Sequence, residues 1–272
     1  MFGANQFGSA QFGGIASNDP IEQAIPGSSL ARLQAVNLIH LANLIESSNI
    51  MIDFNRTLRD RLAGYYHLAD TLSAIGGAAW TNEGSAFAAG KVGDCVVFDG
   101  SGDWVLDIDS TLFGYGTTTN GSPVFTGCLW IKPGASGQTA SVLERANVDT
   151  VTDDGEWYLR LVAGKLRFGS PGSGQGNGYV ESLAALTSGN WYFIVFGMIE
   201  NDGLFLDINN VRQAQNQLTT NAPNSNAPLS LSNGLGGSLN ASIDELGFWD
   251  RSLDSTEKEW LYNTGAGRAF PL

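Results

Sequence analysis

The sequence predicts a mainly β fold, an antiparallel β-sandwich preceded by a helical segment. From about residue 62 onward, short runs rich in Val, Ile, Phe, Tyr and Trp alternate with clusters of Gly, Asn, Asp and Ser. Such runs between turn residues are typical of strands. Apolar and polar side chains alternate within several runs, as in residues 204–208. We therefore expect each strand to bury one face between two sheets and to expose the other.

Residues 1–27 are predicted to be an extended tail. A Phe-Gly pair recurs at five-residue spacing, at Phe2, Phe7 and Phe12, in a stretch without charge. Composition alone favours a disordered tail. The even spacing of the aromatic residues favours an anchor peptide, in which phenylalanines insert into pockets of a larger assembly.

Residues 28–61 are predicted to be a helical segment for oligomerisation or attachment. Ser28 or Ser29 can cap a helix that runs to about residue 46. Apolar side chains surround most of its axis, among them Leu30, Leu33, Leu41 and Leu44. Polar residues interrupt the run of about twenty apolar residues that a membrane span needs, so no membrane insertion is expected. A helix of this kind packs in a bundle, either with copies of itself or against the sandwich of its own chain.

Residues 62–272 are predicted to hold the sandwich, and the end of this part is the most informative. Alternating apolar residues predict a strand over residues 243–248. Asp254 follows as the cap of a short helix, and Gly265 closes that helix.

This closing motif resembles the end of laminin-G-like and pentraxin-like jelly rolls, which are concanavalin A-like sandwiches. Other motifs of the family follow in order: an opening strand (62–70), a strand–turn–strand hairpin (90–105), a central strand (125–133), a middle hairpin (157–168) and a strand pair (189–210). The resemblance spans residues 62–267, and it implies a domain that binds far more often than it cleaves.

Composition argues against several partners. The formal net charge is −13, from 27 acidic and 14 basic residues, and no Lys/Arg run is present. Nucleic acid and anionic membranes are therefore not expected as partners. The first residues do not match an export signal, which indicates synthesis in a cytoplasm. Cys95 and Cys128 are then more often reduced than paired.

No catalytic residue is predicted, and the protein is expected not to be an enzyme. The two histidines, His40 and His67, cannot build a convincing Ser-His-Asp triad or zinc site. Asp244 and Glu245 are neighbours in one predicted strand, so their side chains are expected on opposite faces rather than around one sugar bond.

Calcium is the one cofactor that the sequence raises. The resemblance implies a site at the rim of the sandwich and makes Asp99, Asp103 and Asp244 its candidate ligands, because Asp-rich turns supply the oxygen atoms that calcium prefers. The alternative for the turn at residues 99–103 is a hairpin in which the aspartates accept hydrogen bonds from backbone amides.

Most tryptophans of the predicted strands are assigned to the core rather than to sugar platforms. These are Trp104, Trp130, Trp157 and Trp191. Trp80 lies outside the strand motifs and is predicted to be exposed.

These features together predict a virion structural protein of a bacteriophage, of the decoration, head-fibre or tail-fibre type. Its N-terminus would attach to other virion proteins, and its laminin-G-like domain would face host surface glycans. The strongly apolar helix favours a homo-oligomer, with a trimer preferred. The alternative is a bacterial surface or secreted module for calcium-dependent carbohydrate binding and adhesion.

Overall fold

The computed structural model describes residues 39–41, 43–44, 56–70, 75–76, 80–107, 124–145, 157–170, 178–199, 203–216, 229–232 and 237–270. The chain divides into two units, Met1–Thr57 and Leu58–Leu272. In the first unit, residues 39–41 and 43–44 are helical, and the side chains of Leu41 and Leu44 are 53% and 51% exposed. The other predicted anchor residues lie outside the described residues: Phe2, Phe7, Phe12, Leu30 and Leu33.

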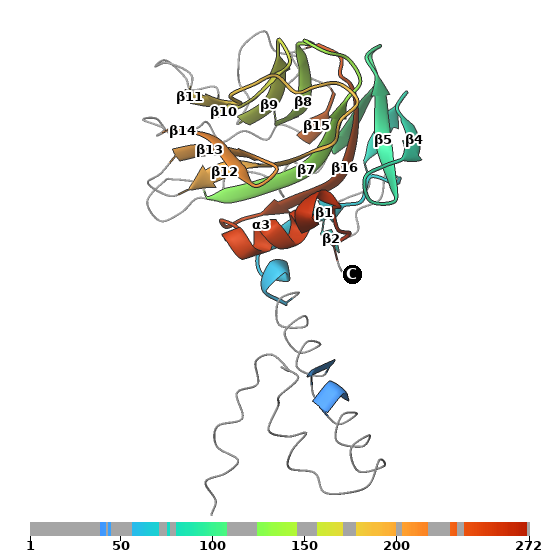
Figure 1. Ribbon diagram of the computed structural model, residues 1–272. Coiled ribbons are helices and arrows are strands. Elements are labelled where there is room, and N and C mark those ends of the chain that lie inside the picture. Colours follow the sequence, from blue (N-terminus) through green and yellow to red (C-terminus); the bar gives the residue numbers. More distant parts are fainter. Residues whose placement is uncertain are drawn as a thin grey trace, which may run out of the picture. The chain divides into compact units, whose positions relative to one another are not determined.

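Two antiparallel sheets make up the second unit and confirm the predicted sandwich (Figure 1). In sheet A the strand order is β14, β13, β12, β7, β16, β1, β2, and β5 pairs with both β16 and β4. The strands of sheet A are β1 (Leu62–Tyr66), β2 (Ile75–Gly76), β4 (Ala86–Ala89), β5 (Asp94–Asp99), β7 (Phe125–Pro133), β12 (Tyr192–Ile199), β13 (Gly203–Ile208), β14 (Val211–Asn216) and β16 (Asn240–Trp249).

Sheet B has the strand order β11, β10, β9, β8, β15, β6, β3. Its strands are β3 (Thr81–Glu83), β6 (Trp104–Asp107), β8 (Ala140–Arg145), β9 (Trp157–Val162), β10 (Lys165–Ser170), β11 (Gly178–Glu181) and β15 (Leu229–Leu231). The core lies between the two sheets, where Trp157 and Phe168 of sheet B meet Phe196 and Phe248 of sheet A at ring distances of 5.1 to 5.9 Å. Aromatic pairs at such distances add to the stability that their burial provides.

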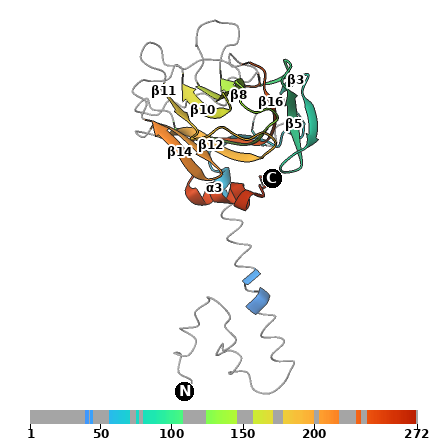
Figure 2. The same ribbon diagram turned by 45° about the horizontal axis from the view of Figure 1, so that its top comes forward.

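The outer face of sheet A is covered by the end of the chain. Helix α3 (Ser255–Tyr262) and the 3-10 turn η1 (Asn263–Gly265) lie beside this sheet (Figures 1 and 2). Tyr262 stacks on Trp130 at 5.9 Å, and Lys258 Nζ lies 2.8 Å from Asp207 Oδ2. The prediction that β13 exposes its polar face was therefore wrong, because α3 packs there and the Asp207 carboxylate is buried in an ion pair.

Most of the predicted strand motifs are confirmed. The middle hairpin is β9–β10, and the strand pair is β12–β13. The stretch 90–105 is not a hairpin, because β5 pairs within sheet A and β6 within sheet B. The turn between them carries the chain from one sheet to the other.

Two local predictions about residues need correction. Trp80 is 4% exposed and packs edge-on against Tyr66 with 4.7 Å between ring centroids, so it belongs to the core. Asp254 caps α3 as predicted, in a capping box with Glu257, but the helix ends at Asn263 in a left-handed conformation (φ 49°) before Gly265 is reached. A C-terminal asparagine can take this conformation in place of glycine.

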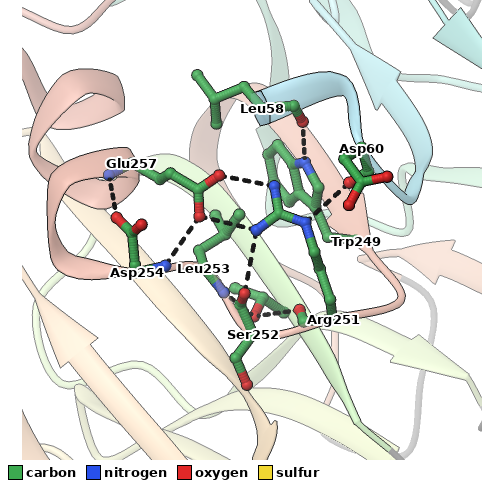
Figure 3. Close-up of polar contacts among 9 residues, drawn as sticks. Leu58, Asp60, Trp249, Arg251, Ser252, Leu253, Asp254 and Glu257 are labelled. Carbon is green, nitrogen blue, oxygen red and sulfur yellow. Dashed lines mark hydrogen bonds and ion pairs between the residues drawn. The ribbon is translucent and has the colours of Figure 1, made fainter. Parts of the chain in front are cut away.

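The start of the second unit is held by the end of β16 (Figure 3). Trp249 Nε1 donates to the Leu58 carbonyl at 2.7 Å, and Arg251 Nε donates to the Asp60 carbonyl at 2.8 Å. The other side of the Arg251 guanidinium forms two bonds with the Glu257 carboxylate, at 2.7 and 2.8 Å. Arg251 therefore links residues 58–61 to α3.

Candidate functional site

The strand β16 contains a bulge that turns two neighbouring carboxylates toward the same side. Ile243 and Leu246 both belong to the core, and the register of β16 against β7 shifts between Asp244 and Gly247. Glu245 has φ 51°, the left-handed conformation of an inserted bulge residue. Asp244 and Glu245 therefore both point away from the core, and the prediction that they face opposite sides was wrong.

Asp244 organises the loop before β5. Its Oδ2 atom accepts hydrogen bonds from the backbone amides of Lys91 and Val92, at 2.7 and 2.8 Å. A Cβ atom at Gly90 would lie 2.5 Å from the same oxygen, so the loop can close on the carboxylate only with glycine there. Burial raises the pKa of Asp244 to about 7, against the lowering effect of the two amides.

Glu245 joins β16 to the end of β1. The Tyr65 hydroxyl donates to Glu245 Oε2 at 2.7 Å, and His67 Nδ1 lies 2.8 Å from Oε1. The hydrogen bond to Glu245 raises the pKa of His67, and burial raises the pKa of Tyr65 well above its ordinary value. These bonds satisfy a buried carboxylate, which is costly to leave unpaired.

The structure does not bring the three candidate calcium ligands together. Asp99 Oδ1 accepts from the Ser101 amide at 2.7 Å, and Asp103 Oδ2 accepts from the Asp99 amide at 3.1 Å. The strand partner of Asp99 is Asn240, four residues from Asp244, which corresponds to roughly 13 Å along β16. Within the part of the chain that the structure describes, no group of three or more His, Cys, Asp and Glu side chains could hold a metal ion.

Cys95 and Cys128 are both free and buried. They lie on β5 and β7, which pair with opposite edges of β16, so a strand separates them. Burial raises the pKa of both thiols, which keeps them protonated.

Among the described residues, no helix is long and apolar enough to cross a membrane.

The outer face of β9, β10 and β11 carries a group of side chains that sequence reasoning missed. The core side of these strands is formed by Leu159, Leu166, Phe168 and Val180, among others. The alternate positions therefore lie on the outer face. We call this group the Tyr–Arg surface: Tyr158, Arg160, Lys165, Arg167, Tyr179 and Glu181.

The strand register arranges the Tyr–Arg surface in rows. Gly169 pairs with Tyr158 on one side and with Tyr179 on the other, and Arg167 pairs with Arg160 and with Glu181. A Cβ atom at Gly169 would lie 2.4 Å from the Tyr158 hydroxyl, so glycine makes room for that ring between the strands.

Each arginine of the surface stacks on a tyrosine. The guanidinium carbon of Arg160 lies 4.3 Å from the ring centre of Tyr158, and that of Arg167 lies 4.0 Å from the ring centre of Tyr179. Tyr179 is 41% exposed, whereas Tyr158 is buried. Stacking holds each guanidinium in place and leaves its edges for hydrogen bonds.

Two carboxylates fix the guanidinium planes. Arg160 Nε and Nη2 donate to Glu144 at 2.6 and 2.9 Å, and Glu144 is fully buried. Arg167 Nη2 donates to Glu181 Oε2 at 2.7 Å, and this bond lowers the pKa of Glu181. The result is an ordered set of donors, an acceptor and an accessible aromatic ring on one side of the sandwich.

A family model of the concanavalin A-like lectin/glucanases superfamily matches residues 109–257, more than half of the chain. The chain belongs to this superfamily. The match confirms the laminin-G-like resemblance. All residues of the Tyr–Arg surface lie within the matched range. A comparison with curated proteins gives no match.

Solved structures of the superfamily fold resemble the sandwich. Domain 4 of AbnA, an extracellular GH43 arabinanase from Geobacillus stearothermophilus solved in complex with arabinotriose, is 18% identical, with a TM-score of 0.58 over 76% of this chain and 98% of that chain. The binding domain of Paraclostridial Mosquitocidal Protein 1 is 16% identical, with a TM-score of 0.60 over 76% of this chain. The binding domain of botulinum neurotoxin serotype G is 12% identical, with a TM-score of 0.59 over 75% of this chain. The matches cover 53% and 51% of these two toxin domains, about half of their length.

Proposed function

We propose that this superfamily member is a non-enzymatic glycan-binding protein and that its sandwich binds sugar at the Tyr–Arg surface. The observation that carries the proposal is the stack of Arg167 on the partly exposed ring of Tyr179, next to Glu181. The likeness to an arabinanase domain that holds arabinotriose supports the same conclusion.

The chemistry of the surface suits a sugar ring. A pyranose presents C–H groups on its faces and hydroxyls around its edge, so it needs an aromatic face together with fixed donors and acceptors. Tyr179 supplies the ring, Arg167 the donors and Glu181 the acceptor, all within neighbouring strands. Because strand pairing fixes the backbone and Glu181 holds the Arg167 side chain, little conformational entropy is lost at these residues when the sugar binds.

A glycan array tests this function. We expect the full chain to bind at least one class of glycan and Tyr179→Ala to weaken that binding about two- to tenfold, since stacking on an aromatic ring contributes roughly 0.5–1.5 kcal/mol. Phe87→Ala on β4 is the matched control, because Phe87 is 40% exposed and lies in the other sheet. Equal loss in both variants, or no glycan bound by the full chain, would contradict the proposal.

We further propose that the protein displays this domain on a bacteriophage particle, as a decoration, head-fibre or tail-fibre protein, and that it is a trimer. The phenylalanine repeat of residues 1–27 and the strongly apolar helix predicted within residues 28–61 support this role. The exposure of Leu41 and Leu44 in the first unit is consistent with a helix that packs against other subunits. Immunogold labelling of purified particles tests the location, and absence of label from the particles would contradict it.

Calcium remains a prediction. The competing function, a calcium-dependent bacterial adhesion module, requires that chelation abolish glycan binding. We expect glycan binding to survive chelation, because none of the contacts within the Tyr–Arg surface needs a cation. The measurement is glycan binding with and without a calcium chelator.

A further inference from the structure

The large hydrophobic side chains that the sandwich exposes gather at one of its edges. Among the described residues of the second unit, these side chains are Phe87, Tyr179, Leu183 and Val211. Phe87 lies on β4, whereas the other three lie on β11, just after β11, and on β14. Leu183 and Val211 are the most exposed, at 74% and 60%. Exposed apolar residues are common singly, but a group of them indicates a binding surface.

Leu183 and Val211 lie close together although they belong to different sheets. β11 is an edge strand of sheet B and β14 is an edge strand of sheet A, and the two strands lie side by side (Figures 1 and 2). The Gln213 side chain joins the two residues. Its Oε1 atom accepts from the Leu183 amide at 3.4 Å, and its Nε2 atom donates to the Val211 carbonyl at 3.1 Å. We call Leu183, Val211 and Gln213 the Leu–Val patch.

The Leu–Val patch continues the Tyr–Arg surface. Tyr179 and Glu181 occupy alternate positions of β11, and Leu183 follows Glu181 by another two residues. The Ser182 amide still donates to the Leu166 carbonyl at 2.8 Å, so the pairing of β11 with β10 reaches the residue before Leu183. From Tyr179 to Leu183 the chain advances by at most about 13 Å. A sugar chain that stacks on Tyr179 can therefore extend onto the patch.

The chemistry of the Leu–Val patch matches an acetyl group, which presents a methyl group beside a carbonyl oxygen. Gln213 Nε2 carries two hydrogen atoms, and its bond to the Val211 carbonyl uses one, so the other can be donated to a ligand. Because the same carboxamide bonds the backbones of Leu183 and Val211, this donor lies beside two exposed aliphatic side chains. None of the three patch residues is charged, which favours a neutral substituent.

We propose that the glycan bound at the Tyr–Arg surface carries acetyl groups, and that one of them binds at the Leu–Val patch. Its methyl group would pack on Leu183 and Val211, and its carbonyl oxygen would accept from Gln213 Nε2. The ligand class is thus an acetylated glycan, with the acetyl group on a nitrogen or an oxygen atom of the sugar. This inference rests on the proposed function, since it names the sugar that the same surface takes. Removal of the methyl group and the two side chains from water gives the patch its preference.

Matched pairs of glycans test the inference. The full chain is measured by titration calorimetry against chitohexaose and cellohexaose, which carry an acetamido group or a hydroxyl at the same carbon. It is also measured against acetylated xylan before and after alkaline removal of the acetyl groups. Any other acetylated glycan that binds on the array is compared with its deacetylated form in the same way.

We expect the acetylated member of at least one pair to bind about fourfold or more tightly, the factor for one buried group of the size of a methyl. The first pair reports on acetyl groups on nitrogen, and the second on acetyl groups on oxygen. Equal binding within every pair, or array binding confined to glycans without acetyl groups, overturns the inference but leaves glycan binding intact. Binding of no glycan by either method overturns both.

Variants locate the acetyl group. We expect Leu183→Ser and Val211→Thr each to lower the preference for the acetylated member about two- to fourfold, because each removes apolar contact with the methyl group. Gln213→Met keeps the length of the side chain without the donor, and should weaken binding of the acetylated member about fivefold. Phe87→Ser is the matched control, since it removes an exposed hydrophobic side chain on β4. Full preference in both Leu183→Ser and Val211→Thr, with circular dichroism showing folded proteins, would overturn the inference.

Light scattering separates glycan binding from contact between copies of the chain. An exposed apolar patch can also hold two protein molecules together. We expect Leu183→Ser to leave the molar mass of the full chain unchanged in the absence of glycan. A lower molar mass in this variant, together with an unchanged preference for acetyl groups, would identify the patch as a contact between copies and would overturn the inference.

Discussion

Asp244 and Glu245 occupy neighbouring positions and are both buried, yet their carboxylates hold different parts of the fold together. Asp244 accepts two backbone amides and so shapes a loop, whereas Glu245 accepts Tyr65 and His67 and so joins two strands. The left-handed φ of Glu245 is what places both on one side of β16. Because burial raises the pKa of Asp244, the stability of the protein is expected to depend on pH.

Asp244 is expected to make the protein less stable as the pH rises toward neutrality. Between the ordinary aspartate pKa of 3.8 and about 7, the unfolded chain ionises this group while the folded protein keeps it protonated. The contribution of Asp244 to the free energy of unfolding is fully present below pH 3.8 and is lost as the pH rises through about 7. Between these values it falls by up to about 1.4 kcal/mol per pH unit. The raised pKa of His67 acts in the same direction above 6.5.

Urea unfolding of Asp244→Asn checks this effect. We expect the free energy of unfolding to depend less on pH in the variant than in the parent protein between about pH 5 and pH 7. Asp250→Asn serves as the control, because that side chain is exposed. Identical pH dependence in Asp244→Asn and the parent would show that the group is ionised in the folded state throughout.

At the scale of elements, Arg251 determines how α3 and residues 58–61 are fixed to the sandwich. Its guanidinium is mostly buried, and it bonds the Glu257 carboxylate and the Asp60 carbonyl (Figure 3). Glu257 is also the residue that completes the capping box of α3. Loss of Arg251 therefore leaves a buried carboxylate at the start of a helix.

Arg251→Ala is expected to lower the free energy of unfolding by roughly 3 kcal/mol, because breaking a buried ion pair from one side leaves the other charge uncompensated. Arg61→Ala breaks an exposed pair with Asp250 and should cost less than about 1 kcal/mol. Urea unfolding of both variants measures the difference. Equal costs would mean that the Arg251 pair contributes no more than a surface pair.

The sequence was sufficient to predict elements whose signal is local. Alternating apolar residues predicted the strand that is β16, the family resemblance predicted β7 and the β9–β10 hairpin, and the cap at Asp254 predicted the start of α3. The crossing from β5 to β6 was not predictable, because the same Asp-Gly turn serves a hairpin or a change of sheet.

The candidate site could not be predicted from the sequence, because it depends on contacts between different strands. The Tyr–Arg surface combines three strands, and only their register places Arg160, Arg167 and Glu181 in one row. Likewise, the bulge at Glu245 leaves no clear mark in the sequence, since glutamate rarely adopts a positive φ. Interactions across strands, rather than propensities within them, decide these features.

At the scale of the whole molecule, the two sheets differ in what lies on their outer faces. Sheet A has α3 and the end of the chain against its outer face, and sheet B carries the Tyr–Arg surface on its outer face. The bonds that hold residues 58–61 are made at the end of β16, in sheet A. The attachment of residues 58–61 and the surface proposed to bind glycan therefore lie on different sheets.

Deleting residues 1–57 should leave the sandwich folded. The remaining unit keeps Leu58, whose carbonyl accepts from Trp249, so we expect a melting temperature within a few degrees of the full chain. If the proposed trimer forms through the deleted residues, light scattering should report a trimer for the full chain and a monomer for the deletion variant. A monomeric full chain, or a trimer that survives the deletion, would contradict that assembly.

The position of β11 at the edge of sheet B determines how the molecule would respond to pulling. If a glycan bound at Tyr179 were pulled while residues 58–61 were tethered, the force would act on the β10–β11 strand pair from the edge of the sheet. The backbone hydrogen bonds between these strands would then break one after another rather than all together. The ion pairs of Lys165 and Arg167 with Glu181 bridge these same two strands. The residues proposed to bind the ligand would therefore also stabilise the strand pair against the pulling force.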